Sequence, residues 1–285
     1  MYYMLVLSVV TASLNSIVMR KVKLNNIRDT FLFNLIVSFI WFGILVSING
    51  FSVAFNHSTV LWGTVYGITQ ALFVFFKTLS MNSGSVSVTT LIGNSSLFIS
   101  VFVSLLVWNE RISSADYLGL FILLISIFLC TYRKSGEEYN KKWGVYTFFF
   151  LIFASGVGIV FKAFGKSGNL DLCSDMMVIS SVVMIISYTV MSCFVKFKSD
   201  CRDCKLSRTF IILAILAGAL SCVYNRLNIY LSGVLDAVVF FPSFNGGVIF
   251  LSSVLSIMIT KEKLSIKQIF GILLGIMSIC IIGIL

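Results

Sequence analysis

Charge is scarce in this sequence, where Asp, Glu, Lys and Arg together make up 11% of 285 residues. A soluble domain carries about 25% charged residues, because water has to wet its surface. With 58% hydrophobic residues, this chain cannot cover itself with polar groups. The composition therefore excludes an ordinary soluble protein and predicts that lipid covers most of the surface.

Proline and histidine are nearly missing, with one residue of each. The single proline, together with 20 glycines, argues against a disordered or fibrous chain. One histidine, and no Asp or Glu near the middle of any apolar run, leave too few groups for clustered catalysis. The cysteines are scattered, and the lone Cys201–Cys204 pair lacks the second pair that a zinc site needs. We therefore expect no enzyme activity, no metal site and no cofactor.

The basic residues lie between apolar runs. The formal net charge is +10, which in a soluble protein would suggest nucleic-acid binding. Between apolar runs, Lys and Arg determine topology and contact anionic lipids. We expect a lipid bilayer and a small-molecule substrate as partners, no nucleic acid, and a monomer or homodimer.

Ten apolar runs follow one another, each near the 20 or so residues that a helix needs to cross a bilayer. In lipid, only a helix satisfies the backbone hydrogen bonds of a single spanning segment. We therefore expect an all-α integral membrane protein with ten transmembrane helices. The expected helices lie at 2–20, 30–49, 59–80, 86–108, 114–132, 143–165, 172–195, 209–231, 236–259 and 265–285.

The second half of the chain repeats the first. A shift of 152 residues places Glu110-Arg111-Ile112-Ser113 on Glu262-Lys263-Leu264-Ser265. Further matches are Gly119 with Gly271, Ser126 with Ser278 and, at a shift of 142 residues, Ile17–Arg20 with Ile159–Lys162. We expect two five-helix repeats, at 1–135 and 142–285. Because five is odd, the second repeat enters the membrane from the opposite side, an architecture typical of secondary transporters.

The orientation follows from Lys and Arg, which favour cytoplasmic loops. With alternating helices, 17 of the 21 Lys and Arg residues fall on one side of the membrane. The other side receives Arg111, Lys162, Lys166 and Arg226. We therefore expect a cell-membrane protein with both termini on the extracytoplasmic side.

These features resemble the drug/metabolite transporter superfamily, in its ten-helix EamA-like branch. The resemblance rests on the five-plus-five repeat, on the Glu-basic-apolar-Ser turns at Glu110 and Glu262, and on Pro242 early in the ninth helix. Thr90 stands where the first half would often carry the matching proline. The resemblance implies a transporter cavity lined by helices one, three, four, six, eight and nine, with helices five and ten at the periphery.

Polar and aromatic residues deep inside the expected helices are the candidates for the site. A shared polar cavity explains them as a set, whereas hydrogen bonds between helices, worth roughly 0.6 kcal/mol each, explain any one of them. The candidate substrate-binding residues are Asn15, Tyr66, Gln70, Asn94, Asn225, Arg226, Phe244 and Asn245.

Charged residues inside or beside the helices allow two interpretations. Arg226 either faces a substrate or extends to the helix end, where Asp236 could pair with it. For Glu110 and Glu262 we expect salt bridges in solvated turns.

The resulting functional hypothesis is a secondary transporter that moves a small organic metabolite by alternating access. Small multidrug exporters rely on a carboxylate in their first helix, and Met1 to Arg20 contains none. A neutral, zwitterionic or anionic solute is therefore favoured over a cation. The alternative is a lipid-handling or solute-sensing membrane protein that binds without transporting.

Overall fold

The computed structural model of this chain is a bundle of ten α-helices. It describes residues 1–22, 27–83, 86–110, 112–131, 141–196, 207–260 and 266–284, so the Cys201–Cys204 pair and Glu262 lie outside the described residues. All ten expected helices are confirmed, with bounds within about three residues of the expected ones. The helices are α1 (Tyr2–Lys21), α2 (Ile27–Ile48), α3 (His57–Ser83), α4 (Val86–Trp108), α5 (Ser114–Thr131), α6 (Lys141–Lys166), the short 3-10 helix η1 (Leu170–Leu172), α7 (Cys173–Lys196), α8 (Arg208–Val234), α9 (Ala237–Thr260) and α10 (Ile266–Ile284).

Within the described residues, seven of these helices are long and apolar enough to cross a membrane. Helices α4, α5 and α10 contribute shorter apolar stretches, at Ile92–Trp108, Ser114–Leu129 and Ile269–Ile282. Large apolar side chains such as Phe102, on α4, and Phe121, on α5, are exposed on the outside of the bundle. Length, composition and apolar surface are those of a multi-pass membrane protein.

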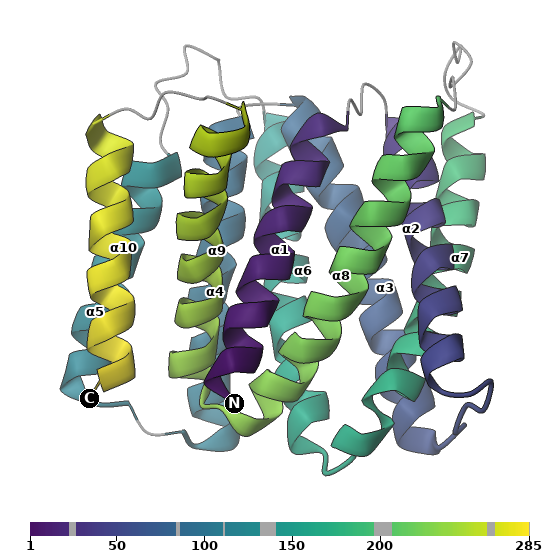
Figure 1. Cartoon of the computed structure of the whole chain (residues 1–285), viewed down its shortest axis with the longest axis horizontal. Helices are drawn as coiled ribbons and strands as arrows, with labels where there is room; N and C mark the ends of the chain where they lie inside the picture. Colours follow the sequence, from purple (N-terminus) through teal and green to yellow (C-terminus); the bar gives the residue numbers. More distant parts are fainter. Residues whose placement is uncertain are drawn as a thin grey trace.

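Successive helices run up and down through the bundle, so that both termini lie at the same end (Figure 1). We call this the terminal end and the opposite one the far end. Helices α2, α3 and α7 pack at one side of the bundle, and α4, α5, α9 and α10 at the other (Figure 1). Each side has its own buried cluster. The first draws on α2, α3, α6, α7 and α8, and the second on α4, α5, α9 and the end of α8.

The helix contacts of the first half recur five positions later. Helix α1 packs against α8 and α9, while α6 packs against α3 and α4. In the same way α2 packs on α8 and α7 on α3. The largest departure from this pattern is that α6 packs on α8, whereas α1 and α3 make little contact in the described part of the chain.

Small residues let several helices approach closely. A Cβ atom added to Gly233 of α8 would lie 2.7 Å from the Cα atom of Gly165 in α6, so these two backbones touch. Helices α5 and α10 are joined by reciprocal hydrogen bonds. Ser126 Oγ donates to the Gly271 carbonyl at 2.6 Å, and Ser278 Oγ donates to the Gly119 carbonyl at 2.7 Å.

Candidate functional site

Two predicted site residues meet between α3 and α8. Tyr66 is fully buried, and its hydroxyl donates to Asn225 Oδ1 at 3.3 Å. The Asn225 amide donates in turn to the Ser221 carbonyl at 2.8 Å, which fixes the orientation of its oxygen. The Tyr66 ring also packs against Phe161 of α6, with ring centroids 5.2 Å apart. This pair is a buried polar contact between the two halves of the chain.

The buried face of α8 carries further polar contacts with the first half. Ser221 and Asn228 lie one turn on either side of Asn225, because a helix places residues three and four apart on the same face. Trp41 Nε1 of α2 donates to Ser221 Oγ at 2.8 Å, and Ser8 Oγ of α1 donates to Asn228 Oδ1 at 2.6 Å. Three different helices of the first half therefore bind one face of α8. Ser8, Ser221 and Asn228 were not among the predicted site residues, although the polar spacing of α8 is visible in the sequence.

Three other predicted residues, Asn15, Gln70 and Asn94, form a layer at one depth, which we call the amide layer. Helices α1 and α3 begin at the terminal end and α4 ends there (Figure 1). Each of the three residues lies 13 or 14 positions from that helix end, and at 1.5 Å per residue this is about 20 Å into the bundle. None of them makes a hydrogen bond within the described part of the chain, and the buried Asn15 Oδ1 atom has no partner there.

Each amide shares an inward face of its helix with a buried neighbour. Asn94 precedes the buried Leu97 by one turn of α4, and Asn15 lies two turns from the buried Ser8 of α1. Gln70 lies one turn beyond the buried Tyr66. An amide turned inward without a partner loses its hydrogen bonds to water without replacing them, unless water or a solute reaches it.

The remaining predicted residues lie on α8 and α9. The Phe244 ring stacks on Phe240 with centroids 6.0 Å apart, and Asn245 donates to the Phe241 carbonyl of its own helix at 2.8 Å. Arg226 is exposed at the surface of α8, and within the described residues it forms no ion pair with Asp236. No hydrogen bond joins Arg226, Phe244 or Asn245 to the amide layer in the described part.

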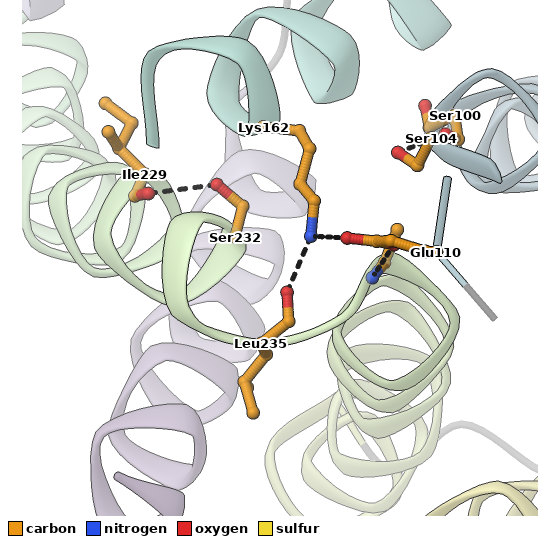
Figure 2. Close-up of polar contacts among 8 residues, drawn as sticks. Ser100, Ser104, Glu110, Lys162, Ile229, Ser232 and Leu235 are labelled. Atoms are coloured by element: carbon orange, nitrogen blue, oxygen red, sulfur yellow. Dashed lines mark hydrogen bonds and ion pairs between the residues drawn. The ribbon is translucent and has the colours of Figure 1, made fainter. Parts of the chain in front are cut away.

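A buried ion pair joins α4, α6 and the turn between α8 and α9 at the terminal end. Lys162 of α6 is completely buried and pairs with Glu110 at the end of α4 (Figure 2). The Lys162 ammonium also donates to the Leu235 carbonyl at 2.7 Å, and Glu110 Oε2 accepts from the Ala237 backbone N–H at 2.8 Å. We call Lys162, Glu110 and the two backbone groups that they bind the charged clamp. The expectation of a solvated turn salt bridge at Glu110 was wrong, because its side chain is only 5% exposed.

The charged clamp is favourable because every charge has more than one partner. A buried ion pair loses much of its hydration energy and recovers it only when further hydrogen bonds are made. Here Leu235 follows the carboxyl end of α8 and Ala237 begins α9. The cation therefore lies at the negative end of one helix dipole and the carboxylate at the positive end of the next. A lysine inside an apolar helix usually has a partner, so Lys162 was the signal in the sequence that could have indicated the pair.

In the residues that the structure describes, no group of three His, Cys, Asp or Glu side chains gathers as it would around a metal ion. No protein-family model and no curated protein matches the sequence. The fold itself is shared with solved structures. One crystal structure of a protein superposes with a TM-score of 0.73 at 10% sequence identity, over 99% of this chain and 96% of the other. At this identity the match shows the fold alone.

Proposed function

We propose that this chain is a secondary transporter of a small organic metabolite in the cell membrane. The observation that carries the proposal is the amide layer, in which Asn15, Gln70 and Asn94 lie about 20 Å into the bundle without a hydrogen bond in the described part, and in which Asn15 Oδ1 is buried. A solute with donors and acceptors would satisfy these groups. Secondary transporters place their substrate at this depth, between two repeats.

Reciprocal contacts support two inverted repeats as the architecture. Ser126 bonds to Gly271, and its repeat equivalent Ser278 bonds to Gly119, the repeat equivalent of Gly271. Such mutual exchange is what a two-fold axis between two similar units produces. The helix contacts that recur five positions later follow the same rule. The proposed axis passes between α5 and α10, and the termini are proposed to lie on the extracytoplasmic side.

The proposed substrate site combines the amide layer with Tyr66, Asn225, Phe244 and Asn245. Carbonyl and amide groups between aromatic rings suit a neutral, zwitterionic or anionic organic molecule with hydrogen-bonding groups. We include Arg226 as a contact that the solute would meet in the conformation open at the terminal end, since this exposed residue lies eight positions from that end of α8.

The contact between α6 and α8 supports alternating access. At the terminal end, Gly165 touches Gly233 and the charged clamp joins α6 to the end of α8. The repeat-equivalent helices α1 and α3 make little contact among the described residues. In the proposed mechanism this conformation is closed at the terminal end and accessible from the far end. The opposite conformation would bring α1 and α3 together and separate α6 from α8.

The test of transport is solute movement into proteoliposomes. Vesicles containing the purified protein are incubated with radiolabelled amino acids, nucleobases, sugars and small carboxylic acids, and the solute inside is measured over time. We expect one class to accumulate to a volume-dependent level, and Gln70→Ala and Asn94→Ala to slow its entry. Thr189→Ala is the matched control, because this exposed hydroxyl of α7 bonds only to its own helix.

Two outcomes would count against transport. A solute that is retained in proportion to the amount of protein, whatever the vesicle volume, would identify a protein that binds without transporting. Uptake at the wild-type rate in both amide variants would remove the amide layer from the transport path.

A further inference from the structure

One face of α3 carries a line of functional groups along most of its length. Tyr66, Gln70, Phe73, Lys77 and Ser80 follow one another at spacings of four and three, which places them on the same side of the helix. Both ends of this line are anchored inside the bundle. Tyr66 bonds to α8, and Ser80 bonds to Thr89 of α4 at 3.2 Å and also to α6.

Lys77 lies on this inward face without an anionic partner. It is half-buried, and its ammonium lies 5.7 Å from the centroid of the Phe73 ring. In the described part of the chain it makes no ion pair and no hydrogen bond, in contrast to Lys162 with its carboxylate and carbonyl. A lysine inside an apolar bundle is expensive and usually marks a partner or a ligand path.

The Phe73 ring, which lies beside the Lys77 ammonium, is part of an aromatic contact between α3 and α6. The Phe73 ring packs against Phe150 of α6 with centroids 5.5 Å apart, and Phe76 stacks on Phe153 at 5.5 Å. Gln70 lies two turns below Lys77, about 10 Å along the axis of α3. This set of groups suits a small organic acid. The cation of Lys77 would bind the carboxylate, the phenylalanine rings the apolar body, and the Gln70 amide the far end.

We propose that Lys77 binds the carboxylate of a small monoanionic organic acid with an apolar body, and this rests on the transport site proposed above. A monoanion neutralises the single ammonium, whereas a doubly charged phosphate would leave an uncompensated negative charge in an apolar environment. The Phe73 and Phe150 rings contact the apolar body, and Gln70 contacts its far end when that end is polar.

The test uses acids and their uncharged amides as matched probes. The melting temperature of purified protein in lipid nanodiscs is measured with benzoate, hexanoate, benzamide and hexanamide at millimolar concentration. We expect the two acids to raise the melting temperature and the two amides to leave it unchanged. Lys77→Met removes the shift, because binding weakens roughly tenfold when a charge-assisted contact is lost. Lys77→Arg keeps the cation and retains part of the shift.

Controls separate this proposal from a lysine that only extends to the membrane surface. Lys166→Met, at an exposed lysine of α6, should leave the response to both acids unchanged. Three results would overturn the proposal: no shift with either acid, equal shifts with acids and amides, or a full acid shift in Lys77→Met. Uptake of a neutral solute by the wild type, together with no acid-induced shift of its melting temperature, would leave transport intact and remove the anion site. If the acids shift the melting temperature of the wild type but no solute is taken up, the anion site stands and the transport proposal fails.

Discussion

Helices α6 and α8 touch at their ends, whereas α1 and α3, which lie five positions earlier in the chain, make little contact in the described residues. The first pair meets at the terminal end through Gly165 and Gly233, with the charged clamp beside them. The second pair carries Asn15 and Gln70, which make no hydrogen bond in the described residues. Two helix pairs that lie five positions apart in the order of the helices therefore differ in their contacts.

The two regions differ in whether their buried polar groups have partners. At the terminal end both charges are paired with each other and each also has a backbone partner, so separating α6 from α8 would expose all of these groups together. Near mid-depth the amides gain partners only from something outside the chain. In the proposed mechanism, transport exchanges the closed α6–α8 contact for a contact between α1 and α3.

The largest effect is expected from breaking the closed contact at Lys162. Lys162→Met leaves the Glu110 carboxylate buried and unpaired and removes a donor from the Leu235 carbonyl. We expect the free energy of unfolding to fall by about 3–5 kcal/mol, measured by denaturant titration in detergent micelles.

The control and the rescue use neighbouring positions. Lys166→Met removes an exposed lysine one turn further along α6 and should change stability by less than about 0.5 kcal/mol. The double variant Lys162→Met with Glu110→Gln should recover much of the loss, because no charge then stays buried alone. Wild-type stability in Lys162→Met would show that the clamp contributes nothing to this end of the bundle.

A smaller loss is expected when the α6–α8 contact is wedged apart. Gly233→Ala places a methyl group 2.7 Å from the Gly165 backbone, so the helices must separate. Overpacking of this kind costs about 1–3 kcal/mol, which thermal unfolding would detect. Gly144→Ala in α6 is the matched control, since an added Cβ meets nothing within 4 Å there. It should be neutral or stabilising by up to about 1 kcal/mol. Equal melting temperatures for the two variants would contradict a close contact.

Most of the fold was predictable because helix position is a local property of this sequence. Runs of about 20 apolar residues bounded by polar connections define the helices. The matches of Ser126 with Ser278 and of Gly119 with Gly271 predicted two similar halves. Their reciprocal hydrogen bonds could not be deduced from the repeat alone, since it does not say which helices meet across the axis.

The candidate site was predictable in its residue types but not in its pairings. Tyr66 and Asn225 were both recognised as deep polar residues, but their contact depends on how α3 crosses α8. Glu110 was misjudged because Arg111 follows it directly in the sequence and offered a nearer partner than Lys162. Arg226, the residue with the most conspicuous charge, is exposed, whereas the buried cation is Lys162.

The smallest effect on stability is expected at Gln70. A change there tests directly whether the space near α1 and α3, which make little contact, is open to water. Gln70→Cys removes an amide that makes no hydrogen bond in the described part, so stability should change by less than about 0.5 kcal/mol. In a background without native cysteines, a membrane-impermeant maleimide should label this cysteine from the far end and not from the terminal end. The buried Tyr66 lies one turn closer to the terminal end, and Tyr66→Cys should label more slowly from either side. Rapid labelling of Gln70→Cys from the terminal end would mean that the charged clamp does not close the path. The comparison between the two helix pairs would then lose its functional meaning.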